Sequence, residues 1–172
     1  MDVNGTLTEL EPIGAPWARP ELGPAVLEHA VRTAMVEALL GPTARPFSEH
    51  IRAAIEVLIA DAGLDASPVG EAVAATAALP ARPDAAEALA MLVAAGKGLV
   101  ALTNSGARAG QATLEACGLA TYVEQVLGVD SVSSFKLQAA PIRVRVRAAR
   151  VGGQRSRGHV DRDAHLGFGR RR

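Results

Sequence analysis

The sequence predicts an α/β protein, in which a Rossmann-like core with a parallel sheet carries an inserted helical cap. Residues 83–129 show helix-like and strand-like patterns in alternation, and this order is typical of a doubly wound parallel sheet. Residues 20–79 instead hold three amphipathic stretches with no strand-like segment between them. We therefore assign residues 1–13 and 80–136 to the core and residues 14–79 to the cap.

Three helices are expected in the cap, because apolar residues recur there at helical spacing. They span residues 20–40, 47–62 and 67–79. Gly63 is expected to end the second helix, while Ser67 and Pro68 are residue types that favour the start of the third. Residues 8–19 contain prolines and a glycine ahead of these helices, so we predict a linker there.

Two helices and two strands are expected in the second half of the core. The helices span residues 83–96 and 107–117, and the strands span residues 99–102 and 123–129. The first strand is a continuous apolar run, which is typical of a strand buried on both faces. Gly118 is expected to cap the second helix, and Cys117 beside it is expected to be a small buried thiol.

The charge of the chain is split between two parts, although the formal total is zero. Residues 1–136 carry 8 Lys and Arg and 16 Asp and Glu, a net charge of 8 − 16 = −8. Residues 137–172 carry 10 Arg and 2 Asp, a net charge of 10 − 2 = +8. Such a split is typical of an appended tail that binds nucleic acid or a membrane surface. We expect residues 137–172 to be a disordered tail outside the core.

A cytoplasmic location is expected from what the sequence contains. The single cysteine fits a reducing compartment, because it cannot form an internal disulfide. The N-terminus is acidic and has no basic region of the kind that opens a signal peptide. Since no run of about 18 apolar residues is present, no membrane partner is expected.

The segment Asp-Val-Asn-Gly-Thr-Leu, at residues 2–7, is the first candidate for chemistry. Gly5 permits a sharp turn after a strand, and the Thr6 hydroxyl can bond the turn backbone and hold Asp2 in place. A carboxylate fixed in this way can act as a nucleophile that forms an ester intermediate. The alternative is an ordinary N-terminal turn, since these residue types are common in loops.

Thr103 and Asn104 end the first predicted strand and precede a helix. A hydroxyl, an amide and free N–H groups of the helix N-terminus then point to one place, which suits a carboxylate or phosphate. Ligands bind at the carboxyl ends of parallel strands, so Asp2 and Lys136 are expected near this place. The Lys136 ammonium can neutralise the carboxylate and a bound anion. Capping residues at a loop and a solvated lysine are the alternatives.

Three motifs together resemble those of the haloacid dehalogenase superfamily, in particular its type II branch, the (S)-2-haloacid dehalogenases. The motifs are Asp-x-Asn-Gly-Thr-Leu, Leu-Thr-Asn-Ser and Ser-Val-x-x-Phe-Lys, and the likeness covers residues 1–136. The resemblance implies that Asp2 displaces halide from the substrate carbon, after which water hydrolyses the ester. It also implies that Thr103 and Asn104 hold the substrate carboxylate and that Lys136 offsets negative charge.

The resemblance further implies a helical cap that closes over a small 2-haloacid or a similar carboxylate, with no metal or cofactor. Asn4 stands where the phosphatase branch has a second aspartate, which protonates the leaving group beside magnesium. An amide cannot donate a carboxyl proton, so Asn4 argues against phosphotransfer and is assigned to substrate binding. Dehalogenases often have a tyrosine at this position and a cap arginine that receives the halide. Arg32 is a candidate for that role, but it comes about five residues late.

The chain departs from the family pattern at both ends. The apolar strand expected before Asp2 is reduced to Met1, so we expect a truncated N-terminus. After Lys136 the fourth motif is absent. When the possible codons of residues 164–171 are regrouped one nucleotide later, they can encode His-Thr-Trp-Asp-Ser-Ala-Gly-Ala, which resembles the missing segment. Our hypothesis is that the chain after about residue 136 is a frameshifted reading.

The expected function is hydrolytic dehalogenation through an aspartyl ester, in a chain of low stability and weak or absent activity. Low stability is expected because unpaired strands expose apolar faces and backbone groups. Another hydrolase of the superfamily, such as a phosphatase, is the first alternative. The second is a non-catalytic fragment whose basic tail binds nucleic acid, although the tail has no aromatic residue apart from Phe168. Relatives often form dimers, so a homodimer is one assembly to test.

Overall fold

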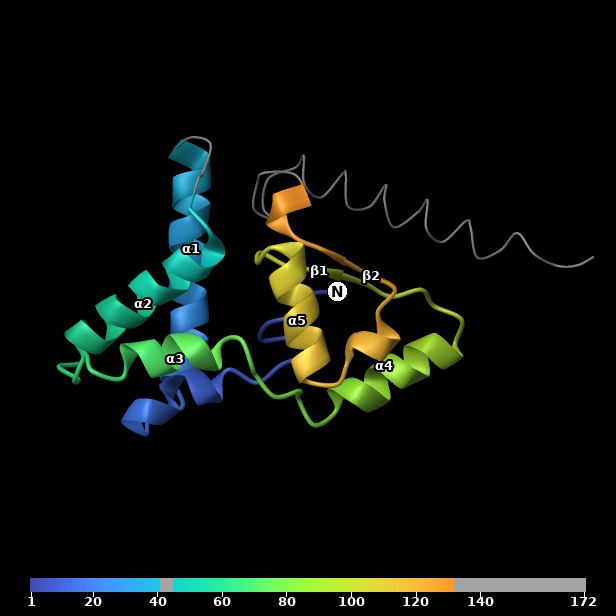
Figure 1. Ribbon diagram of the computed structural model, residues 1–172, viewed down its shortest axis with the longest axis horizontal. Coiled ribbons are helices and arrows are strands. Elements are labelled where there is room, and N and C mark those ends of the chain that lie inside the picture. The colour runs from blue at the N-terminus through green and yellow to red at the C-terminus, as the bar shows by residue number, and fades with distance from the viewer. Residues whose placement is uncertain (41–44, 132–172) are drawn as a thin grey trace, which may run out of the picture.

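The computed structural model describes residues 1–40 and 45–131, which form two adjoining regions. Figure 1 shows helices packed together in one region, and a small sheet with helices beside it in the other. The helical region is inserted between the N-terminal residues and the rest of the α/β region. This arrangement confirms the predicted fold class. None of the helices in the described ranges is long and apolar enough to cross a membrane.

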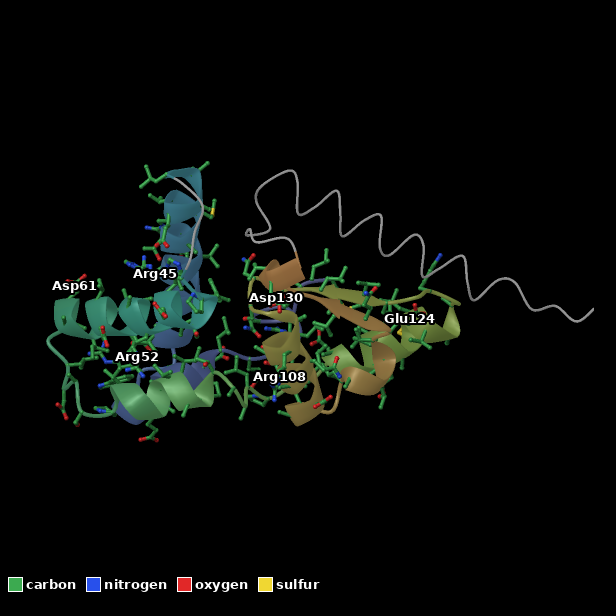
Figure 2. All side chains as sticks on the ribbon, turned by 45° about the horizontal axis from the view of Figure 1, so that its top comes forward. Arg45, Arg52, Asp61, Arg108, Glu124 and Asp130 are labelled. Atoms are coloured by element: carbon green, nitrogen blue, oxygen red, sulfur yellow. The ribbon has the colours of Figure 1, made fainter. Side chains whose placement is uncertain are left out.

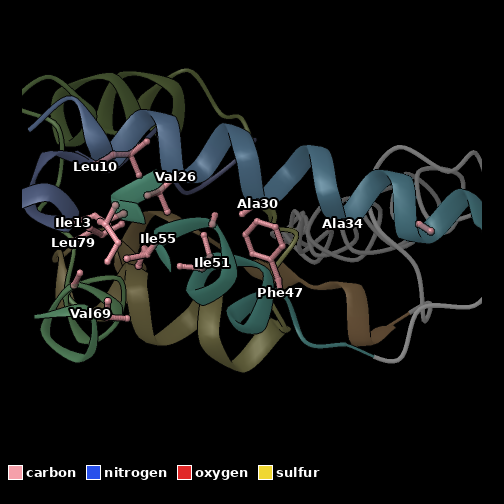
Figure 3. Close-up of a cluster of buried hydrophobic side chains, with 14 residues drawn as sticks. Leu10, Ile13, Val26, Ala30, Ala34, Phe47, Ile51, Ile55, Val69 and Leu79 are labelled. Atoms are coloured by element: carbon pink, nitrogen blue, oxygen red, sulfur yellow. The ribbon is translucent and has the colours of Figure 1, made fainter. Parts of the chain in front are cut away.

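Two packed helices form the centre of the helical region, α1 (Leu22–Leu40) and α2 (Phe47–Asp61). Alanine predominates among the buried residues of α1 and isoleucine among those of α2, so large side chains pack against a smooth surface. With α3 (Val69–Ala75) and the 3-10 helix Glu11–Trp17, they enclose the cap cluster (Figure 3). Its buried residues are Leu10, Ile13, Val26, Ala30, Ala34, Ala38, Phe47, Ile51, Ala54, Ile55, Ile59, Val69, Ala72 and Leu79.

The prediction of a linker over residues 8–19 is wrong, because most of this segment forms the 3-10 helix Glu11–Trp17. A proline at the start of a short helix is tolerated, since the first N–H groups have no helical partner. Ile13 is 2% exposed, and the indole N–H of Trp17 donates to the backbone carbonyl of Asp65 at 2.7 Å. Leu10 and Ile13, which lie in the sequence-assigned core segment, pack in the cap cluster.

The third cap helix starts later and ends earlier than predicted, at Val69 and Ala75. Its N-cap is Pro68, and no side chain caps it. Ser67 instead bonds the carboxylate of Asp65 through its hydroxyl and its amide, and these bonds lower the pKa of Asp65. After Ala75 the amides of Ala77 and Ala78 donate to the carbonyls three residues earlier, so the backbone continues in 3-10-like turns rather than in an α-helix.

The α/β region has the predicted order of helix, strand, helix, strand. Helix α4 (Ala85–Ala94) precedes β1 (Val100–Leu102), and α5 (Ala107–Ala116) precedes β2 (Gln125–Leu127). The two strands pair in parallel, as expected for strands joined by a crossover helix. The second strand is shorter than predicted, because the chain enters a 3-10 helix at Val129.

Met1 lies beside β1 in the place of a third strand. Its ammonium group donates to the carbonyl of Val100 at 2.8 Å, and the amide of Leu102 donates to the carbonyl of Met1 at 2.6 Å. These two bonds alternate along β1 as they do in a parallel ladder. After Asp2 the chain leaves the sheet, since the amide of Leu7 donates back to the carbonyl of Val3 at 2.8 Å.

The α/β region has its own hydrophobic cluster, which we call the sheet cluster. It joins residues from the N-terminal turn, from both helices and from the sheet. Its buried residues are Val3, Leu7, Ala85, Leu89, Leu99, Ala101, Leu114 and Leu119. Cys117 is half-buried and packs against this cluster, with its thiol 3.6 Å from the carbonyl of Leu114, so the predicted burial of this thiol is partial.

Two backbone segments join the regions and bond to each other. The amide of Glu9 donates to the carbonyl of Pro80, and the amide of Arg82 donates to the carbonyl of Leu7, both at 2.9 Å. Thr8 lies in this antiparallel crossing and is fully buried. Its hydroxyl oxygen has no hydrogen-bond partner among the described residues. Two backbone hydrogen bonds therefore hold the crossing together. The Thr8 hydroxyl within it is buried without a hydrogen bond to any described residue.

Candidate functional site

A cavity of about 630 Å³ lies between the helical region and the α/β region. From the α/β side it is lined by Asn4, Ser105 and Asp130, among others. From the helical side it is lined by Phe47 and Arg45, among others. In Figure 2, Arg45 and Asp130 lie on the two facing sides of this boundary. The cavity is thus at the carboxyl ends of the parallel strands, where ligands bind in such sheets.

Asp2 follows Met1, so it lies at the end of the third strand position, at the level of Leu102 in β1. Its side chain is exposed, and its Oδ1 accepts a hydrogen bond from the amide of Val3 at 2.9 Å. The cavity wall begins two residues further on, at Asn4. The fold therefore places the candidate nucleophile at the strand end, beside the cavity rather than in its lining.

Gly5 meets two independent constraints in the turn after Asp2. Its φ of +76° lies in the left-handed region that favours glycine. A Cβ atom there would lie 3.1 Å from Cδ1 of Leu10 and 3.2 Å from Cδ2 of Leu27, which is tight packing against the cap. The turn is thus held closely under α1. Thr6, the other expected supporting residue, is exposed, and its amide donates to the carbonyl of Val3 at 3.2 Å.

Asn4 presents an unusual polar atom to the site. The residue lines the cavity, and its Oδ1 is buried with no hydrogen-bond partner among the described residues. A buried oxygen without a donor is costly, so a ligand or water that donates to it would be stabilising. This feature could not be found from the sequence, which shows only that an amide follows Asp2.

Thr103 and Asn104 directly follow β1, and neither residue lines the cavity. Thr103 is 3% exposed, and its hydroxyl oxygen accepts a hydrogen bond from the amide of Ser105 at 3.0 Å. Asn104 is half-buried and has an interaction within the protein. The hydroxyl of Thr103 therefore shapes the loop that carries Ser105 into the cavity lining.

Asp130 is a site residue that the sequence reasoning did not assign. The amide of Ala107, in the first turn of α5, donates to Oδ1 and Oδ2 of Asp130 at 3.0 and 3.1 Å. A carboxylate at a helix N-terminus is stabilised by the free N–H groups and the helix dipole. Part of the anion site predicted at this helix is therefore occupied by the chain itself, which corrects the expectation of free N–H groups. An acidic residue just after a strand was the available signal.

Gly128 makes this contact between β2 and α5 sterically feasible. A Cβ atom at this position would lie 2.1 Å from the amide nitrogen of Ala107 and 2.6 Å from Oδ1 of Asp130. Both distances are far below van der Waals contact. Only glycine therefore allows the end of β2 to pass this close to the start of α5.

Two cap arginines differ in their relation to the cavity. Arg32 is exposed and pairs with Glu28 on the same helix, and it does not line the cavity. Arg45 does line it, and its Nε donates to Oε2 of Glu37 at 2.8 Å. This hydrogen bond to Glu37 raises the pKa of Arg45 above its usual value. The one cap arginine among the described lining residues is thus Arg45 rather than Arg32.

Lys136 lies outside the described residues, so its place relative to Asp2 stays a prediction. Within residues 1–40 and 45–131, no group of three or more His, Cys, Asp and Glu side chains gathers in a way that could hold a metal ion. In the described part of the site, the amide of Asn4 lines the cavity, while the carboxylate of Asp2, the hydroxyl of Thr103 and the amide of Asn104 lie at strand ends outside the lining. These groups can act as a nucleophile and as hydrogen-bond partners for a small polar ligand.

Comparison with solved structures identifies the fold. A dehalogenase structure superposes with a TM-score of 0.76 at 22% identity, over 88% of this chain and 69% of that chain. The L-2-haloacid dehalogenase of Xanthobacter autotrophicus, with chloropropionic acid covalently bound, gives a TM-score of 0.72 at 24% identity, over 86% and 62%. A predicted phosphoglycolate phosphatase from Haemophilus somnus gives 0.51 at 20% identity, over 86% and 68%.

No protein-family model matches the sequence, and no curated protein matches it either. The chain spans between 62% and 69% of the length of the two dehalogenases. At these identities the likeness concerns the fold, and the haloacid dehalogenase-like fold that the sequence motifs suggested is confirmed.

Proposed function

We propose that this chain descends from, and can act as, a hydrolase that removes halide from a small 2-haloacid through an ester on Asp2. The observation that supports the proposal is that Asp2 follows the strand position held by Met1 and precedes Asn4, which lines the cap–core cavity, by two residues. The same fold in the Xanthobacter autotrophicus enzyme holds chloropropionic acid covalently. Asp2 is a strand-end carboxylate, and a carboxylate can form such a bond.

The proposed reaction has two steps that balance. In the first, a carboxylate oxygen of Asp2 attacks C2 of the acid, the carbon–halogen bond breaks, and halide leaves with the bonding electron pair. In the second, water adds to the ester carbonyl, the 2-hydroxy acid leaves, and Asp2 regains its carboxylate with release of one proton. Covalent catalysis of this kind replaces one difficult displacement by two easier steps.

The remaining assignments concern charge and orientation. Thr103 and Asn104 are assigned to the substrate carboxylate, and Lys136 is assigned to the negative charge that accumulates between that group and Asp2. Asn4 is assigned to substrate binding, which is supported by its place in the cavity lining and by its side-chain N–H groups, which can donate to a carboxylate. Of the two cap arginines, Arg45 is the candidate to receive the halide, because it lines the cavity.

Phosphate transfer is the competing function, and the fold alone does not separate the two, since a predicted phosphatase also superposes. The residue that favours dehalogenation is Asn4. A phosphatase of this kind needs a carboxyl proton for its leaving group, and an amide cannot supply one. Magnesium-dependent phosphate release by the purified chain would reverse this choice.

The test is a single-turnover reaction of the purified chain with 2-chloropropionate in water enriched in ¹⁸O. We expect chloride release, and ¹⁸O in the carboxylate of Asp2 when the N-terminal peptide is analysed by mass spectrometry. Asp2→Asn should lower chloride release by about a thousandfold or more, while Asp61→Asn, an exposed carboxylate at the end of α2, should leave it unchanged. Label found only in the product acid would refute the ester.

A further inference from the structure

The large apolar side chains of the cavity gather on one side, which we call the apolar side, although Arg45, Ser48 and Thr76 line the same side. Asn4, Ser105 and Asp130 bring polar groups from the α/β region. The apolar side is built mainly by the N-terminal segment, the cap helices and the turn after α3. Its side chains are Leu10, Ile13, Leu27, Phe47, Ile51 and Leu79. A ligand that fits both sides is therefore amphipathic, with a polar head and an apolar body.

The apolar side is part of the packed cap and is therefore preformed. Of its six side chains, all except Leu27 belong to the buried cap cluster, and Phe47 is only 5% exposed. Leu27 lies over Gly5, beside the turn that carries Asp2. These side chains are fixed by their neighbours in the cap cluster, so the wall does not need to form around a ligand.

The size of the cavity exceeds what a short haloacid fills. 2-Chloropropionate has six non-hydrogen atoms, and at about 30 Å³ per non-hydrogen atom, as in liquid water, it occupies about 180 Å³. The cavity holds about 630 Å³. With a three-carbon acid at the polar side, water would remain in the rest of the cavity, against the small part of the apolar side that is left exposed, whereas an alkyl or aromatic substituent would displace it.

We infer that this cavity selects acids with an extended apolar substituent on C2, of about six carbons or more. The inference rests on the proposed function for the chemistry at the acid group, but the preference itself is a property of binding. Each methylene that moves from water to the apolar wall should tighten binding about fourfold, until the wall is covered.

The test measures binding and turnover separately on the full chain. Isothermal titration calorimetry with propionate, hexanoate and octanoate, which carry no halogen, reports the preference without chemistry. We expect octanoate to bind at least tenfold tighter than propionate. Chloride release from 2-chlorooctanoate and from 2-chloropropionate then reports the chemistry, and kcat/KM is expected to be at least tenfold higher for the longer acid.

Two leucine substitutions on α5 localise the effect. Ala112 is exposed and lines the cavity, so Ala112→Leu should fill part of it without disturbing a packed core. Ala116 is exposed on the same helix and does not line the cavity, so Ala116→Leu is the matched control. Ala112→Leu should remove most of the advantage of octanoate over propionate, and Ala116→Leu should keep it.

Equal affinity for the three acids, or an octanoate advantage that survives Ala112→Leu, would overturn the inference. If 2-chloropropionate releases chloride through Asp2 while octanoate binds no tighter than propionate, the proposed function stands and the selectivity is wrong. If octanoate shows the advantage and no haloacid releases chloride, the selectivity of the cavity stands and the proposed function is wrong.

Discussion

The helical region encloses its own hydrophobic core, whereas the α/β region leaves much of one helix in water. In α2, six of fifteen residues are buried, and they form one continuous stripe. In α4, only Ala85 and Leu89 are buried among ten residues, and the consecutive side chains of Met91, Leu92 and Val93 are 67%, 43% and 46% exposed. Leu39 and Leu40 at the end of α1 are also exposed, but the buried residues of α1 pack with those of α2 in the cap cluster.

This difference follows from how the two kinds of structure gain their stability. A helix can bury its apolar stripe against the next helix in the sequence, and α1 and α2 do so within 40 residues. A parallel sheet needs several strands and a helix layer on each face, and a two-stranded sheet is marginal by itself. The cap is therefore expected to be the more stable region, and α4 to be the weakest part.

The largest expected effect tests whether the cap carries the stability. Ile55→Ala removes a side chain that is 1% exposed in the cap cluster, so the free energy of unfolding should fall by about 2–5 kcal/mol. Met91→Ala in α4 should change it by less than about 0.5 kcal/mol, because its side chain is exposed. Urea denaturation followed by circular dichroism measures both. Equal losses for the two variants would contradict the comparison.

The next prediction compares a glycine-to-alanine substitution in the α/β region with the same type of substitution in the helical region. Gly128→Ala should lower the free energy of unfolding by about 1–3 kcal/mol, because the new methyl group overlaps the start of α5. Gly70→Ala, on α3 with open space around it, should raise it by about 0.5–1 kcal/mol through helix propensity. Thermal unfolding of the two variants gives the comparison, and stabilisation by Gly128→Ala would show that the β2–α5 contact is looser than described.

A smaller effect is expected at the crossing between the regions. Thr8 is fully buried and its hydroxyl has no partner among the described residues. Thr8→Val replaces this hydroxyl with a methyl group of similar size, so we expect a gain of about 1 kcal/mol in the free energy of unfolding. Thr8→Ser keeps the hydroxyl and should not give this gain. A loss of stability in Thr8→Val would mean that the hydroxyl is hydrogen-bonded in solution.

The smallest effect is a pH dependence that belongs to the cap. His50 is 1% exposed, and its pKa is lowered by burial and by Arg45, against the opposing effect of Glu37 and Glu49. The unfolded state therefore binds a proton more readily than the folded state. The contribution of His50 to stability is present above pH about 6.5 and decreases as the pH falls below that value, toward the lower folded pKa.

His50→Gln removes this titration while it can still bond the hydroxyl of Thr33, which lies 3.3 Å from Nδ1 of His50. Urea midpoints measured between pH 5 and pH 8 should fall less steeply toward acid in this variant than in the parent chain. Identical slopes would show that other groups determine the acid sensitivity of the cap.

The sequence was sufficient for the order of the elements and for the fold. Its strongest signals were local ones, such as the apolar run before Thr103 and the glycine after Asn4. It was least reliable for residues 8–19, where prolines indicated a linker and the chain forms a packed 3-10 helix. Burial against α1 and α3 decides that segment, and such contacts cannot be derived from local residue preferences.

The candidate site could be predicted only as a set of strand ends. Asp2, Thr103 and Asn104 were assigned because each occupies the end of a strand position, which the order of the elements determines. Asp130 and Arg45 were not assigned, because their roles depend on side chains from distant elements, the start of α5 and Glu37 on α1. Long-range pairs of this kind have no periodic signal.

The placement of the aromatic side chains has a practical consequence. The chain contains one tryptophan and one tyrosine. Trp17 packs against the cap cluster and bonds Asp65, whereas Tyr122 packs against the sheet cluster. Indole fluorescence and phenol absorbance are therefore two built-in optical reporters, one for each half. Whether the halves melt as one unit or in sequence can be read from an unlabelled sample.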